Sequence, residues 1–199
     1  MDNIMDQYAR AAATLYGIIG FDDFFNILDS YYGEGSLSKD RIMAYFWASK
    51  VKDPVYYIQG ELIVHASIPP DDIARTLAGI QHSIGDKAPQ YHRILPEKEF
   101  LLYANPLYYE DSPGTRNMEA YLVAALGRSP DEAREIVAEM AFICRSGSYP
   151  TFVIDALDRR GYPTKKEEKL DLILIALDIE AETRQWERLG ATGREMSGR

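Results

Sequence analysis

The stretch Val55-Tyr-Tyr-Ile-Gln-Gly-Glu-Leu-Ile-Val-His65 decides the fold of the first third of the chain. β-Branched and aromatic residues flank Gln59-Gly60 on both sides, as two strands joined by a tight turn require. Upstream, helical spacing of apolar residues predicts three helices, at about 2–16, from about 22 to Gly33, and from a Ser38 cap to about Lys50, with a short extended piece, 17–20, after the first. This order of elements is typical of a winged-helix domain, so we expect residues 1–68 to form a winged-helix-like lobe.

The rest of the chain is predicted to be helical. Residues 69–115 are expected to hold a connecting helix, at about 71–84, and an irregular segment with one short helix, at about 97–104. Residues 116–199 are expected to form a helical bundle. Within it, Ser129-Pro-Asp-Glu132 and Thr164-Lys-Lys-Glu167 are capping boxes that each begin a helix, and the second of these helices is predicted to reach about Leu189. The fold class is therefore mainly α with a small β-hairpin.

The longest predicted helix, from Thr164 to Leu189, has apolar residues on two sides, and both sides call for burial. One interpretation makes it the central helix of the C-terminal bundle, and this is the one we favour. The other assigns one side to a dimer seam formed by Leu172, Ile175, Ile179 and Trp186, with Leu170, Ile173, Leu174 and Leu177 on the opposite side.

Composition and charge narrow the classes of protein. The net charge of −9 works against unspecific attraction to nucleic acid or to an anionic membrane. No run is apolar enough for a membrane span, and the first ten residues contain Asp2 and Asp6 rather than a basic leader, so a cytoplasmic protein is expected. Cys144 is the only cysteine, which excludes an internal disulfide, and its place on an apolar helical stripe predicts a buried, inert thiol.

The third helix of a winged-helix domain is the one that enters a DNA groove, so its outward face is a test of that function. With Ile42, Tyr45 and Phe46 inward, the outward residues are one anion, one cation and two alanines: Asp40, Arg41, Ala44 and Ala48. Cations at the helix ends that could touch phosphates are Lys39, Lys50 and Lys52, with Arg41 between them. Residues 1–70 nevertheless contain five Lys or Arg against nine Asp or Glu. This charge favours a protein-docking lobe over a DNA-reading one.

Few residues suggest a metal-binding, ligand-binding or catalytic site. Glu61 and His65 face the same way on a strand and could begin a metal site with Asp71 or Asp72, but a metal pocket needs three or four converging ligands, so a half-exposed strand edge is the preferred interpretation. The aromatic run around Tyr103, Tyr108 and Tyr109 could line a groove between lobes, although packing of a loop is the simpler explanation. We expect no metal, no cofactor and no catalytic residue.

Two short motifs carry a family resemblance. The first is Leu15-Tyr-Gly-Ile-Ile-Gly-Phe-Asp-Asp-Phe-Phe-Asn-Ile27, and the second is Thr183-Arg-Gln-Trp186 followed by Gly190-Ala-Thr192 and Glu195-Met196. In both, the chain resembles a loosely defined group of uncharacterised Firmicutes proteins, some of which end in a SEC-C metal-binding tail. It departs from that group at Glu182, where the group tends to have Asn, and at Gly193, where it tends to have Pro. No cysteine-rich tail follows Met196, so the resemblance implies a bacterial origin and no metal-binding function.

Three functions follow as hypotheses. The leading one is a non-enzymatic regulatory or adaptor protein whose winged-helix-like lobe binds another macromolecule, with protein as the expected partner; a homodimer is the alternative that belongs to the less favoured dimer seam. The second is a DNA-binding transcription regulator that uses the cations around the third helix. The third is an enzyme or small-molecule sensor with a pocket between the lobes near Tyr103 to Tyr109.

Overall fold

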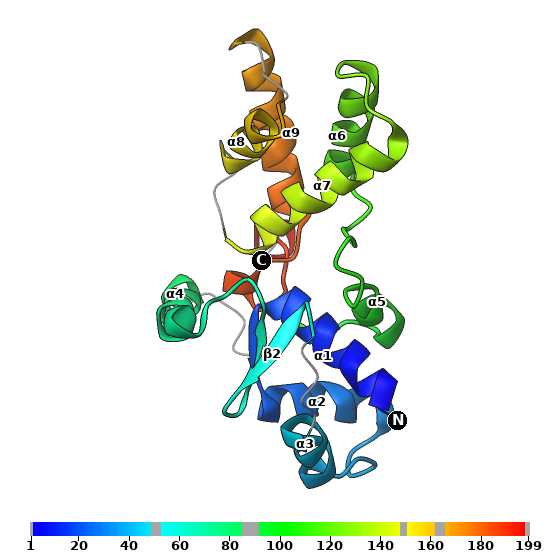
Figure 1. Cartoon of the computed structure of the whole chain (residues 1–199), viewed down its shortest axis with the longest axis vertical. Coiled ribbons are helices and arrows are strands. Elements are labelled where there is room, and N and C mark those ends of the chain that lie inside the picture. The colour runs from blue at the N-terminus through cyan, green and yellow to red at the C-terminus, as the bar shows by residue number, and fades with distance from the viewer. Residues whose placement is uncertain (1, 49–52, 85–91, 148–150, 162–165, 198–199) are drawn as a thin grey trace. The chain divides into compact units, whose positions relative to one another are not determined.

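A computed structural model describes residues 2–48, 53–84, 92–147, 151–161 and 166–197. The chain forms two compact units, Met1–Pro106 and Leu107–Arg199, which run from blue to green and from green to red in Figure 1. The expected division into 1–68, 69–115 and 116–199 stays a prediction, although the segment after residue 68 contributes its first part to unit 1 and its last part to unit 2.

Unit 1 has the order of helices and strands that was expected for its N-terminal lobe. Its three strands form one antiparallel sheet in the order β1-β3-β2, in which Ile18 pairs with Val64 and Ile58 with Ile63. Strand β1, which joins the hairpin of β2 and β3, is the short extended piece that was expected between the first two helices. The elements of the lobe are α1 (Asp2–Tyr16), β1 (Ile18–Gly20), α2 (Phe21–Tyr32), α3 (Lys39–Ala48), β2 (Tyr56–Gln59) and β3 (Leu62–His65). The predicted fold class, mainly α with a small β-hairpin, is confirmed.

The turn of the hairpin lies one residue later than predicted. Gln59 pairs with Leu62, so the two turn residues are Gly60 and Glu61 rather than Gln59 and Gly60. Gly60 has a φ of 60°, a conformation that glycine adopts without a steric penalty and that a tight hairpin needs at its first turn position. The position of the glycine therefore sets the register, and Gln59 becomes the last residue of β2.

Helix α1 is the centre of unit 1. Helical spacing predicts an apolar stripe of Ile4, Tyr8, Ala11, Ala12 and Leu15, and all of it except the half-buried Ile4 is fully buried, as is Ala13 on another side of the helix. A stripe on one side predicts packing on one neighbour, but α1 contacts β3 on one side and α5 (Glu97–Leu102) on another. Small alanines let these neighbours approach closely, which makes α1 a core helix around most of its circumference.

Tyrosine hydroxyls on α1 and α2 hold the segment that leads into α5. Tyr16 donates a hydrogen bond to the carbonyl oxygen of Arg93 at 2.8 Å, and Tyr31 donates one to that of Leu95 at 2.9 Å. Tyr8 donates to the carboxylate of Glu97, and burial together with this bond raises the pKa of the Tyr8 hydroxyl. Unit 1 is completed by the 3₁₀ turn η1 (Pro70–Asp72) and by α4 (Ile73–Ile84), close to where one helix was predicted.

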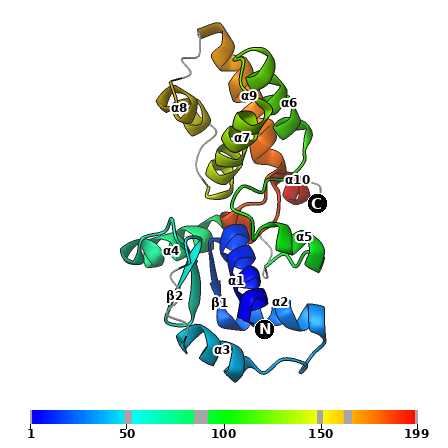
Figure 2. The ribbon, with the colours of Figure 1, turned by 45° about the vertical axis from the view of Figure 1, so that its right-hand side comes forward.

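Unit 2 is a helical bundle. Figure 2 shows α6, α7 and α9 lying beside one another, and their contacts enclose a core that includes Met118, Ile136, Met140, Leu172 and Ile179. The Ser129 capping box is confirmed, whereas Thr164 lies outside the described residues. The elements are α6 (Pro113–Ala124), α7 (Pro130–Arg145), α8 (Thr151–Arg159), α9 (Lys166–Glu182), a 3₁₀ turn η3 (Trp186–Arg188) and α10 (Gly193–Ser197).

The start of α6 and the end of α9 differ from prediction. Helix α6 begins at Pro113, inside the segment 69–115 that was expected to be irregular near its end, because Ser112 and Thr115 form a capping box that was not recognised in the sequence. Helix α9 ends at Glu182 instead of about Leu189. The backbone N–H of Arg184 donates to the Glu110 carboxylate at 3.2 Å. Because Glu110, far away in the sequence, accepts this bond, the N–H does not continue the hydrogen-bond pattern of the helix. No helix among the described residues combines the length and the apolar character that crossing a membrane requires.

Candidate functional site

The outward surface of α3 is the candidate functional site of unit 1. Ile42 and Phe46 point inward, and the Phe46 ring packs against the rings of Phe21, Phe24 and Tyr56. This aromatic cluster fixes the rotation of α3 about its own axis. The predicted outward residues are exposed, and so is a further one: Asp40, Arg41, Ala44, Ala48 and Trp47.

Trp47 is the residue that the sequence analysis missed. Its side chain is 60% exposed, the largest exposed aromatic group among the described residues. Tryptophan has a large apolar area and is enriched in the well-packed centres of protein interfaces, which makes an exposed one unusual. The signal was present in the sequence, because a residue directly after an inward Phe46 must lie about 100° around the helix from it.

The cations proposed for nucleic-acid binding are dispersed. Lys39 forms an ion pair with Asp22 of α2, which neutralises part of its charge. Arg41 is exposed, and in the described part of the chain it has no ion-pair partner. Lys50 and Lys52 lie outside the described residues. The four-residue phosphate-binding set stays a prediction, with Arg41 as its one described cation that is both exposed and unpaired.

The hairpin of β2 and β3 is anchored to α1 at the start of β2. Tyr56 donates a hydrogen bond to Asp6 at 2.8 Å, and burial together with this carboxylate raises the pKa of the Tyr56 hydroxyl. Arg10 forms an ion pair with Asp53 at 2.7 Å just before β2. These contacts hold β2 against α1, while the turn at Gly60 is left exposed.

The residues considered for a metal site do not form one. The Nδ1 atom of His65 lies 2.8 Å from the hydroxyl of Ser67, and the backbone carbonyl of Glu61 accepts a bond from the N–H of Phe21. Within the described ranges, no three His, Cys, Asp or Glu side chains are grouped so that they could hold a metal ion.

The predicted aromatic groove is divided between the two units. Tyr103 is buried in unit 1, whereas Tyr108 and Tyr109 belong to unit 2. Tyr109 donates a hydrogen bond to Glu119 at 2.6 Å, and burial raises the pKa of its hydroxyl. A groove that includes all three tyrosines stays a prediction.

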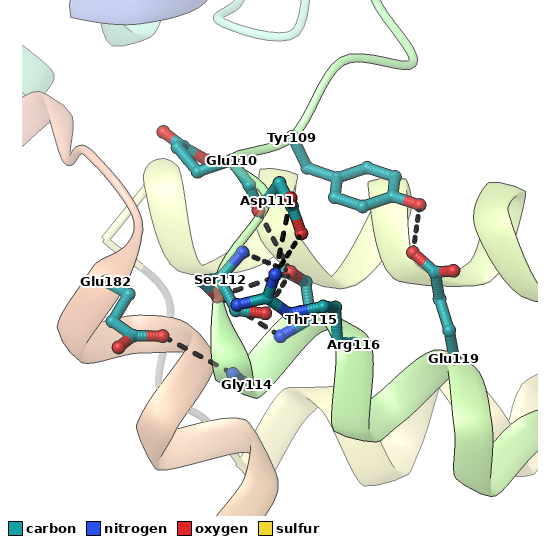
Figure 3. A network of polar contacts seen from close by, with 9 residues as sticks. All are labelled: Tyr109, Glu110, Asp111, Ser112, Gly114, Thr115, Arg116, Glu119 and Glu182. Atoms are coloured by element: carbon teal, nitrogen blue, oxygen red, sulfur yellow. Dashed lines mark hydrogen bonds and ion pairs between the residues drawn. The ribbon is translucent and has the colours of Figure 1, made fainter.

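A polar network surrounds the start of α6, as Figure 3 shows. The Thr115 hydroxyl donates to the carbonyl oxygen of Glu110 at 2.9 Å, and the N–H of Ser112 donates to the Thr115 hydroxyl at 2.9 Å. From the end of α9, the Glu182 carboxylate accepts a bond from the N–H of Gly114 at 3.3 Å. A carboxylate at a helix N-terminus satisfies a free N–H group and interacts favourably with the helix dipole. The network therefore connects α6 to α9.

Glu110 extends this network to α7. Its carboxylate pairs with the guanidinium of Arg145 at 3.0 Å, and the Arg145 side chain is only 1% exposed. The same carboxylate accepts the N–H of Arg184. A buried cation needs such a partner, because an uncompensated charge in the interior is strongly destabilising. The pair thus has a structural explanation and indicates no reaction.

The second motif of the family resemblance closes unit 2 after α9. Arg184 makes two bonds to the carboxylate of Glu195, at 3.0 and 3.3 Å, and Thr192 and Glu195 form a capping box for α10. The Trp186 ring packs edge-on against Phe142 of α7, with ring centres 5.8 Å apart. These residues therefore have a structural role in fastening the end of the chain to the bundle.

The apolar residues of α9 are distributed differently from the predicted dimer seam. Leu172, Ile179 and Trp186 are buried, and Ile175 packs against the same core, so the predicted seam lies inside unit 2. The exposed apolar side of α9 is the opposite one, with Leu170, Leu174 and Leu177. The prediction that α9 is a central helix of the bundle agrees with these contacts.

Comparisons with protein-family models, curated proteins and solved structures found no match to this chain. The resemblance to the Firmicutes group therefore stays an expectation. Evidence on function comes from the geometry of the two units alone.

Proposed function

We propose that this protein is a non-enzymatic regulatory or adaptor protein whose winged-helix-like lobe binds another protein through the outward face of α3. The observation that carries the proposal is the exposed Trp47 side chain. An indole on the surface of a rigid helix loses little conformational entropy on binding and contributes a large apolar area. A partner that covers Trp47 buries more apolar area there than at any other exposed residue of this face.

The charges around α3 support protein over DNA as the partner. Arg41 is balanced by Asp40 on the same face, and Lys39 already pairs with Asp22. A duplex-binding surface gains most of its affinity from several cations that each displace counterions from phosphates. Among the residues of this face that the structure describes, one free cation beside a carboxylate is a poor basis for that mechanism.

The proposal can be tested with the two tryptophans of the chain, because they have opposite environments. Trp186 is buried, so the Trp186→Phe variant reports only on Trp47. Its emission should be red-shifted and readily quenched by acrylamide in the free protein. Adding a protein partner should shift the emission to shorter wavelength and protect it from the quencher.

Partners are to be identified from nuclease-treated cell lysate by affinity capture. A true partner should be retained by the wild type and by Leu102→Ala, an exposed apolar residue outside α3, and lost with Trp47→Ala. If every captured protein is retained equally by Trp47→Ala, the α3 face is not the docking surface.

The second function, a DNA-binding transcription regulator, is favoured by one observation, the winged-helix order of the sheet with an exposed Arg41 on α3. It predicts submicromolar binding of a DNA duplex in fluorescence anisotropy, with an affinity that falls steeply as salt rises. Arg41→Glu should abolish that binding. Salt-dependent duplex binding by the wild type that Arg41→Glu abolishes would overturn the adaptor proposal.

A further inference from the structure

Helix α9 is orange in Figure 1. On one of its sides a row of leucines is exposed. Leu170, Leu174 and Leu177 are 64%, 54% and 44% exposed. Their offsets of 0, 4 and 7 place them on one side of the helix. Scattered single apolar residues are ordinary on a protein surface, but a continuous row of this kind marks a site of interaction.

The row has no role in the core of its own unit. Leu172, Ala176 and Ile179, on the opposite side of α9, are fully buried and already pack against α6 and α7. Polar residues at the positions of the exposed leucines would leave this core unchanged. The leucines are therefore available to a partner without any rearrangement of the bundle.

An acidic edge runs along the leucine row. Asp171 and Asp178 are exposed, are seven residues apart, and lie on the Leu174 side of the row. Neither carboxylate has an ion-pair partner in the part of the chain that the structure describes. The opposite edge contains the half-buried Ile173. The leucine face, as we name Leu170, Leu174, Leu177, Asp171 and Asp178 together, is thus apolar in the middle and negative along one edge.

We propose that the leucine face docks an amphipathic helix of a second protein, one with an apolar stripe bordered on one side by Lys or Arg. Such a helix covers the leucines and places cations beside both free carboxylates. The site is separate from α3, so it adds a second binding surface to the proposed adaptor and does not depend on the first.

A second copy of the chain fits this face less well. In an antiparallel pair, the two-fold axis brings the acidic edges of both copies together, which is repulsive. In a parallel pair, the acidic edge of one copy meets the Ile173 edge of the other, where Glu180 adds a carboxylate and the one described cation, Lys169, already faces Asp158 at 3.9 Å. Each copy also contributes a net charge of −9. Charge complementarity therefore points to a basic partner.

The test uses the full-length protein and a labelled synthetic peptide of about three leucine–lysine heptads as the probe. Fluorescence anisotropy should show micromolar binding to the wild type. Leu174→Lys should weaken it at least about tenfold, because a buried leucine is replaced by a cation facing cations. Leu102→Lys makes the same change of charge on α5 of unit 1 and should leave the affinity unchanged.

Exchanging the charges tests the acidic edge directly. The double variant D171K/D178K should lose affinity for the leucine–lysine peptide and gain affinity for a leucine–glutamate peptide of equal length. Circular dichroism should show that the variants remain folded, and Asp171→Lys alone repeats the test away from the start of α6, which Asp178 adjoins. The proposal is overturned if the peptide does not bind, or if Leu174→Lys and Leu102→Lys change the affinity for the peptide equally. It is also overturned if analytical ultracentrifugation shows a dimer of the protein that Leu174→Lys dissociates.

Discussion

Gly114 is a position where a single added methyl group should destabilise unit 2, because it meets backbone atoms of α9. It lies in the first turn of α6, where the helix meets the backbone of α9. A Cβ atom at this position would be 2.8 Å from the amide nitrogen of Ile179 and 2.9 Å from the carbonyl carbon of Asp178. Backbone atoms cannot rotate away as the end of a side chain can. Gly114→Ala therefore requires α6 and α9 to separate.

The size of the effect follows from two opposing contributions. Overpacking costs about 1–3 kcal/mol, while alanine in place of glycine favours a helix by up to about 1 kcal/mol. The net loss in the free energy of unfolding should be about 1–2 kcal/mol, which lowers the Tm of a unit of this size by roughly 5–15 °C.

Thermal unfolding followed by circular dichroism measures the effect of Gly114→Ala. The matched control is Gly79→Ala in α4, where an added Cβ meets no atom within 4 Å and the helix should become slightly more stable. If Gly114→Ala unfolds at or above the wild-type temperature, α6 and α9 do not approach each other as described.

Three other predictions concern charged and titratable groups. Arg184→Met removes both bonds to Glu195. In urea titration it should lower the free energy of unfolding by about 1–2 kcal/mol, a figure already reduced because the Glu195 carboxylate is partly exposed. An unchanged urea midpoint would mean that this pair does not hold the end of the chain. Burial lowers the pKa of His92 below its ordinary 6.5, although the charge of Asp23 opposes the shift. The unfolded chain therefore binds a proton more readily, so stability should fall as the pH drops below about 6.5, and His92→Gln should reduce this slope. Burial raises the pKa of the Cys144 thiol to about 12, so a disulfide reagent at pH 8 should modify Cys144 only when unit 2 opens, and rapid labelling of the native protein would contradict its burial.

Local signals in the sequence were sufficient for most elements. The first helix was predicted with the ends that the structure has, because its apolar spacing and the following Gly17 mark it clearly. The Ser129 capping box located the start of α7 for the same reason. Both signals depend on residues within one or two turns of each other, so they can be read without knowing the rest of the fold.

Errors arose where a distant residue decides a local feature. Helix α9 stops at Glu182 because the Glu110 carboxylate, more than seventy positions earlier, takes the N–H of Arg184. No periodicity in the sequence reports such competition for a partner. Trp47 is a different case, since its spacing from the inward Phe46 already places it on the outward face of α3.

The sequence by itself determined the helices, the hairpin, the single thiol and the acidic charge of this protein, since these depend on composition and on neighbouring residues. Only the tertiary structure decided which side of α9 is buried. Two apolar rows compete for one core, and the row that contains Leu172 and Ile179 wins because α6 approaches α9 at Gly114, where no side chain keeps them apart. The row of Leu170, Leu174 and Leu177 is left exposed by the same contact.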